Sequence, residues 1–66
     1  MIYYKIDVLT ELKRKGLSTY QLRKEKLLSE GAIQSLRNGE PISFANLGNL
    51  CKLLDLQPGD IIGYKN

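Results

Sequence analysis

Side chains that could bind a nucleic acid are concentrated between residues 18 and 38. They include amides at Gln34 and Asn38, hydroxyls at Ser29 and Ser35, and the cation Arg37. Such groups can donate to or accept from the base edges in the major groove of DNA, and hydroxyls and arginines also reach phosphates. Gln34 is the best single candidate for reading a base, because an amide can pair bidentately with adenine. The alternative is that these residues form the polar outer face of an ordinary surface helix.

Basic residues are concentrated in the same half of the chain. Between residues 13 and 26 there are six lysines and arginines and one acid, Glu25, so this segment carries +5 while the remaining residues sum to −2 and the net charge is +3. A local concentration of this kind is typical of a polyanion-binding surface, since each neutralised phosphate releases counterions. The alternative is that these charges are only the solvated faces of two short helices.

Other chemistries have little support. The single Cys51 excludes an internal disulfide, and the absence of histidine leaves no plausible zinc ligand set. A chain of 66 residues buries only about 60% of its unfolded surface, which leaves little for a substrate cleft. No apolar run approaches the roughly 18 residues of a membrane span. We therefore expect a cytoplasmic protein that is not an enzyme and has no cofactor, metal or membrane partner.

Capping residues predict the helices that position these groups. Gly16 and Asn38-Gly39 mark helix ends, Ser18 with Gln21 three residues later resembles a capping box, and Ser29 and Ser43 are suitable N-caps. Together with apolar residues at helical spacing, these signals predict one domain, residues 1–66, with helices near 6–15, 19–26, 29–37, 43–54 and 58–62.

The predicted core comes mainly from the fourth of these helices. It has an inward stripe of Phe44, Leu47, Leu50, Cys51 and Leu54. The end segments Ile2-Tyr3-Tyr4 and Gly63-Tyr64-Lys65 are aromatic enough to pair as a short β-ribbon or to meet a second subunit. The fold class we expect is all-α.

The order of these signals resembles the Xre or Cro/phage-repressor family of helix-turn-helix domains. The resemblance covers essentially the whole chain and rests on these segments: Gly16-Leu17-Ser18, Leu22, Leu28-Ser29, Ile33, Leu36, Asn38-Gly39 and Leu56-Gln57-Pro58-Gly59-Asp60-Ile61-Ile62. It implies a compact five-helix, lambda-repressor-like bundle whose third helix enters the major groove, and a homodimer that reads paired half-sites of double-stranded DNA.

The resemblance also implies roles for individual residues. Thr19 and Tyr20 approach a phosphate, residues 30, 31, 34 and 35 sit towards bases, and Asn38 lies near the backbone. The full set of candidate DNA-binding residues is Ser18, Thr19, Tyr20, Lys24, Ser29, Glu30, Gly31, Gln34, Ser35, Arg37 and Asn38.

Three positions depart from the usual pattern of the family, and a fourth places a carboxylate on the surface expected to face DNA. Arg23 replaces the usual small residue, Lys26 replaces an apolar one, and Leu27 stands where a turn glycine is usual. A left-handed Leu27 would cost roughly 1 kcal/mol and would need burial in compensation. Glu30 either accepts a hydrogen bond from a cytosine amino group or favours the N-terminus of its helix electrostatically.

Two functions follow from the sequence. The first is a sequence-specific transcriptional regulator, a repressor that binds DNA as a dimer. The second is a helical protein-interaction module, such as an antitoxin or accessory subunit with the same fold. Salt separates them, because DNA binding weakens steeply with salt concentration and an apolar protein interface does not.

Overall fold

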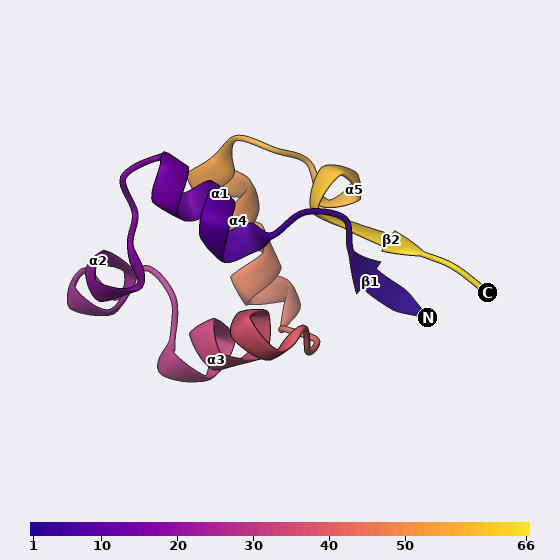
Figure 1. Cartoon of the computed structure of the whole chain (residues 1–66), viewed down its shortest axis with the longest axis horizontal. Helices are drawn as coiled ribbons and strands as arrows, with labels where there is room; N and C mark the ends of the chain where they lie inside the picture. The colour runs from indigo at the N-terminus through magenta and orange to yellow at the C-terminus, as the bar shows by residue number, and fades with distance from the viewer.

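Five helices and a two-stranded antiparallel ribbon make up the structure, a computed structural model that describes residues 1–66 (Figure 1). The molecule measures 37 Å along its longest axis and 21 and 19 Å along the others. In chain order the elements are β1 (Ile2–Tyr4), α1 (Val8–Arg14), α2 (Thr19–Lys24), α3 (Glu30–Asn38), α4 (Phe44–Leu54), α5 (Pro58–Ile61) and β2 (Ile62–Tyr64).

Side-chain caps explain where the first four helices begin. The hydroxyls of Ser18, Ser29 and Ser43 accept hydrogen bonds from backbone N–H groups three residues later, at 3.3, 3.1 and 3.1 Å. The carboxylate of Asp7 does the same for α1, at 3.3 Å. Each cap satisfies one N–H group that has no partner within the helix. The three serine caps confirm the sequence prediction, whereas Asp7 was missed and α1 therefore begins at Val8 rather than residue 6.

Two glycines with positive φ end α1 and α3. Gly16 has φ +84° and Gly39 has φ +72°, values that glycine adopts without steric cost. Both were predicted as helix ends. The predicted boundary of α5 was one residue too long, because Ile62 leaves the helix and begins β2.

The turn between α2 and α3 differs from expectation. Leu27 does not take the left-handed conformation, because the residue with positive φ in this turn is Lys26, at φ +54°. This conformation ends α2 at Lys24, two residues earlier than predicted. The exposed Lys26 side chain takes the strained position, and Leu27 is left half-buried against the core.

The core contains ten buried hydrophobic residues and no buried polar side chain. All five helices contribute to it, and the five largest fully buried side chains are Leu12, Leu22, Ile33, Leu50 and Ile61. Phe44 was predicted to face this core, but its side chain is 90% exposed. Phe44 is the first residue of α4. Because helical side chains tilt towards the N-terminus, Phe44 points beyond the body that covers Leu47 and Leu50.

The ribbon joins the two ends of the chain, which is one of the two arrangements expected for the terminal aromatic segments. Ile2 pairs with Tyr64, Tyr3 with Gly63 and Tyr4 with Ile62. The hydroxyl of Tyr4 donates a 2.6 Å hydrogen bond to the carbonyl of Glu40, which ties β1 to the segment after α3. None of the helices is both long enough and apolar enough to cross a membrane.

Candidate nucleic-acid interface

Helix α2 lies at the end of the molecule away from the ribbon, and α3 lies beside it, towards the middle (Figure 1). Leu22 of α2, Leu28 of the turn and Ile33 of α3 are buried in the same core cluster. Their burial fixes α3 to the body while its opposite side remains in solvent. The turn thus presents a short helix whose polar side chains are accessible.

The outer face of α3 carries most of the candidate residues. Glu30, Gly31, Gln34, Arg37 and Asn38 are exposed, while Ser35 is half-buried. A Cβ atom added at Gly31 would meet nothing within 4 Å, so the small residue leaves open space on this face. Such a surface allows another polymer to approach the backbone of α3 closely.

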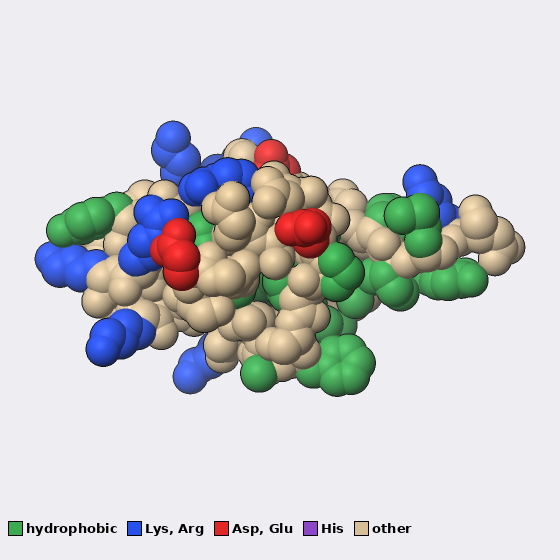
Figure 2. All heavy atoms as spheres, turned by 90° about the horizontal axis from the view of Figure 1, so that it is seen from below, with side chains coloured by type: hydrophobic (Ala, Val, Ile, Leu, Met, Phe, Trp, Pro, Cys, Tyr) green, Lys and Arg blue, Asp and Glu red, His purple; other side chains and the backbone are tan.

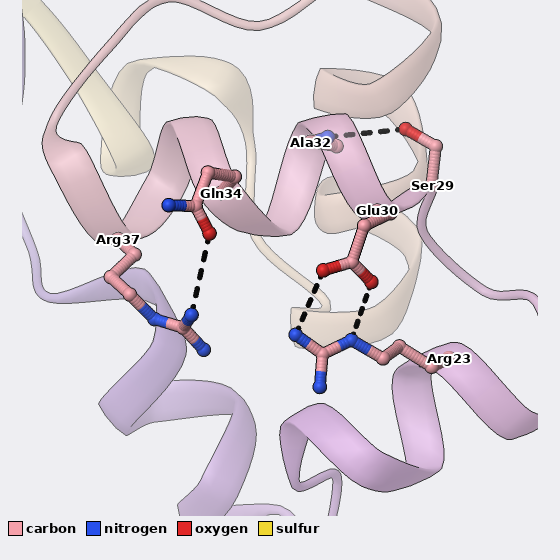
Figure 3. A network of polar contacts seen from close by, with 6 residues as sticks. All are labelled: Arg23, Ser29, Glu30, Ala32, Gln34 and Arg37. Carbon is pink, nitrogen blue, oxygen red and sulfur yellow. Dashed lines mark hydrogen bonds and ion pairs between the residues drawn. The ribbon is translucent and has the colours of Figure 1, made fainter.

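Arg23 and Glu30 form an ion pair that the sequence did not predict. The Nε and Nη2 atoms of Arg23 donate to the two carboxylate oxygens of Glu30, at 2.5 and 2.9 Å (Figure 3). Both side chains are substantially exposed, at 43% and 65%. The pair connects the last turn of α2 to the first turn of α3. Opposite charges on the two sides of a predicted turn were the signal available in the sequence.

The ion pair bears on both expectations for Glu30. Its carboxylate lies in the first turn of α3, where a negative charge is favourable. It is also neutralised by Arg23, so its charge opposes a nearby polyanion less than that of a free carboxylate. Beside it, Arg23, Lys26, Leu28, Ser29 and Glu30 line an open hollow of about 460 Å³ between the two helices.

Gln34 and Arg37 form a second polar pair on α3. The Nη1 atom of Arg37 donates to Oε1 of Gln34 at 3.3 Å. In Figure 3 the amide nitrogen of Gln34 points away from the guanidinium. The two side chains therefore lie next to each other on the exposed face, one turn apart.

Several cations near α2 are free of acidic partners. The structure contains two ion pairs, which engage Arg14 with Glu11 at 3.1 Å and Arg23 with Glu30. Consequently the ammonium groups of the basic segment are available to an external anion; they belong to Lys13, Lys15, Lys24 and Lys26. Figure 2 shows most of the positive side chains on this face near the end that carries α2.

Tyr20 and Lys24 form the outer surface of α2. The Lys24 ammonium lies 5.8 Å from the centre of the Tyr20 ring, and Tyr20 is 64% exposed. Thr19 is only half-buried, as is Ser18. The hydroxyl oxygens of Ser18 and Ser29 already accept capping bonds, but each hydroxyl keeps its own hydrogen as a donor.

The opposite end of the molecule carries an apolar surface that was not predicted from the sequence. We call it the ribbon groove, an open depression of about 350 Å³ lined by Ile2, Tyr3, Tyr4, Gly39, Pro41, Ile42, Phe44, Leu47 and Ile62. No lysine, arginine or carboxylate lines it. Figure 2 shows hydrophobic side chains gathered towards this end. Phe44 was assigned to the core from its spacing, which concealed this surface.

All eleven candidate residues lie on α2, on α3 or at their caps. The chain was also compared with models of known protein families. The model of a family described as Cro/C1-type HTH DNA-binding domains matches residues 5–66. Searches of curated proteins and of solved structures found no match to the chain.

Proposed function

The chain belongs to the family of Cro/C1-type helix-turn-helix DNA-binding domains, and from this membership we propose that it is a transcriptional repressor that selects its site by inserting α3 into the major groove. The observation that carries the proposal is the exposed polar face of α3 beside a group of unpaired lysines. A helix of this size fits the major groove, and the lysines supply attraction to phosphates.

The candidate residues divide into two groups in this proposal. Glu30, Gly31, Gln34 and Ser35 face base edges, which carry the sequence information. The other residues contact the phosphate backbone and fix the register of the helix: Ser18, Thr19, Tyr20, Lys24, Ser29, Arg37 and Asn38. Backbone contacts add affinity that does not depend on sequence.

We further propose that the repressor binds as a homodimer. One helix of nine residues contacts too few base pairs to select a site in a genome. The ribbon groove supports a second copy as its partner, because its lining is apolar and includes Phe44, which is 90% exposed in the single chain. An apolar patch that every copy carries can pack against itself around a two-fold axis. No charged side chain lines the groove, so two copies can meet there without burying like charges against each other.

Selection of bound duplexes from a random DNA pool at near-physiological salt tests the proposal. We expect enrichment of an inverted repeat whose half-sites lie about 10 base pairs apart, which is the spacing of one helical turn. If the folded protein enriches no sequence, the proposed function is wrong.

The ribbon groove also favours a second candidate function, that of a protein-interaction module such as an antitoxin or accessory subunit. An apolar depression lined in part by a large exposed aromatic side chain is typical of a surface that binds another protein. Salt distinguishes the two functions. The affinity for DNA should fall linearly with the logarithm of salt concentration, whereas the affinity for a protein at the ribbon groove should change little.

A further inference from the structure

We infer that Arg37 sets the base preference of Gln34 and directs it to guanine rather than adenine. The inference rests on the proposed function and assigns a specificity-determining role to a residue that the proposal gives only a backbone contact. It begins from the hydrogen bond between the two side chains, 3.3 Å from Arg37 Nη1 to Gln34 Oε1.

The chemistry of the two groups fixes which end of the amide is engaged. A guanidinium has five N–H donors and no acceptor, so its partner on Gln34 must be the amide oxygen. The amide nitrogen then points away from Arg37, as Figure 3 shows. Gln34 and Arg37 are both exposed, so this nitrogen and the remaining guanidinium N–H groups are available to a ligand.

A free glutamine and this pair present different patterns to a base. A free glutamine matches adenine because its oxygen accepts from N6 while its nitrogen donates to N7. In the pair, Arg37 occupies one lone pair of the oxygen, and its positive charge disfavours a second donor such as the adenine amino group. The Gln34–Arg37 pair therefore presents only hydrogen-bond donors to a base.

Guanine is the base that matches a surface of donors. Its major-groove edge presents two acceptors, N7 and O6. The neighbouring Glu30 does not reverse this preference, because Arg23 binds both of its carboxylate oxygens. Gln34 and Arg37 together thus present hydrogen-bond donors to the base, and both carboxylate oxygens of Glu30 are engaged by Arg23.

The test compares Arg37→Met with the matched control Lys52→Met, which removes the same charge from the last turn of α4. The operator is first obtained by selection, and the position read by Gln34 is identified as the one whose preference disappears in Gln34→Ala. Affinity is then measured for all four bases at that position. Melting curves establish that each variant is folded.

We expect the wild-type protein to bind guanine at least about fivefold more tightly than adenine at this position, near the lower end of what one bidentate contact provides. Arg37→Met should reverse the order in favour of adenine, since the amide oxygen is released. Lys52→Met should leave the guanine-to-adenine ratio unchanged.

A second variant tests the same chemistry from the other residue. Gln34→Glu replaces the amide with a group that only accepts, so the guanine preference should disappear even with Arg37 in place. A guanine preference that survives in Arg37→Met or in Gln34→Glu overturns the inference. So does an adenine preference in the wild-type protein, and in each of these cases the proposed function stands. Failure of the folded wild-type protein to select any sequence overturns both.

Discussion

The guanidinium of Arg23 holds the carboxylate of Glu30 through two nearly parallel hydrogen bonds, of 2.5 and 2.9 Å. The ion pair joins α2 to α3 across the helix-turn-helix, at the surface proposed to face DNA. In this arrangement each residue neutralises the charge of the other, so the attraction of Arg23 for a phosphate and the repulsion between Glu30 and a phosphate are both weakened.

Replacement of Glu30 by Gln should therefore strengthen DNA binding. The change removes a negative charge and releases Arg23 for a phosphate, so the slope of log affinity against log salt should become steeper by about 0.9. Unfolding free energy should fall by about 1 kcal/mol or less, because both side chains are exposed. Titrations at several salt concentrations measure the slope. Asp55→Asn, which makes the same charge change at the end of α4, is the control; equal slopes for the two variants would contradict the prediction.

Gln34→Ala and Lys24→Ala should weaken binding in different ways. The loss of Gln34 should cost about 1 to 3 kcal/mol at the preferred sequence and relax selectivity at one base position. The loss of Lys24, which lies over the Tyr20 ring on the outside of α2, should weaken all sequences nearly equally. Competition binding against a set of single-base operator variants separates the two patterns. If Gln34→Ala retains the full preference of the wild-type protein, the placement of α3 in the groove is wrong.

Leu50→Ala should unfold the domain or bring it close to unfolding. Leu50 is fully buried at the centre of α4, and truncation of a buried leucine costs about 2 to 5 kcal/mol, a large share of the stability of a small domain. Urea denaturation followed by circular dichroism measures the change. The neighbouring exposed residue provides a matched control, since Asn49→Ala should leave the midpoint nearly unchanged.

Phe44→Ser should dissociate the proposed dimer and leave the monomer folded. The side chain is 90% exposed in the single chain, so its loss removes little buried surface from the monomer but much from an interface at the ribbon groove. Sedimentation velocity reports the change in mass. Tyr20→Ser removes an exposed aromatic from the opposite end and should leave the dimer intact. A Phe44→Ser protein that sediments like the wild type would place the interface elsewhere.

Tyr4→Phe should destabilise the domain by about 0.5 to 1.5 kcal/mol, because it removes the hydrogen bond to the Glu40 carbonyl. Burial raises the pKa of the Tyr4 hydroxyl above its ordinary value of 10.0. A raised pKa in the folded state means that the stabilising contribution is complete below pH 10.0 and is lost as the pH rises through the folded-state pKa. The difference in unfolding free energy between the two proteins should accordingly shrink above about pH 10. Tyr3→Phe is the control at the adjacent position of β1; the Tyr3 hydroxyl makes no hydrogen bond, so at neutral pH its loss should change the unfolding free energy less than the loss of the Tyr4 hydroxyl.

Helix ends could be predicted from the sequence because their causes are local. The serine caps and the two left-handed glycines act on backbone groups within a few residues, so their spacing is visible in the chain. The same holds for most core positions, which repeat at helical spacing. The exposed polar face of α3 followed from these assignments.

Features that depend on how one helix packs against its neighbours could not be predicted from the sequence. Phe44 has the right spacing for the core of α4, but only the structure reveals that the first turn extends beyond its neighbours. Similarly, no local rule decides whether Lys26 or Leu27 takes the left-handed conformation, since the burial of Leu27 depends on the completed core. Predicting the Arg23–Glu30 ion pair would require the angle between α2 and α3, which cannot be read from the sequence.

The ribbon has a consequence for how the chain folds. Its two strands lie at opposite ends of the sequence, so their pairing closes a loop that contains all five helices. Closing so long a loop in an unfolded chain costs conformational entropy, and the pairing of only three residues on each strand offsets little of that loss. Once the helices have packed, the two ends are already near each other, and pairing the strands no longer requires that loss of entropy. We therefore expect the two strands to pair last during folding and to separate first during unfolding. Hydrogen exchange would detect this as weaker protection of the backbone amides in β1 and β2 than in α4.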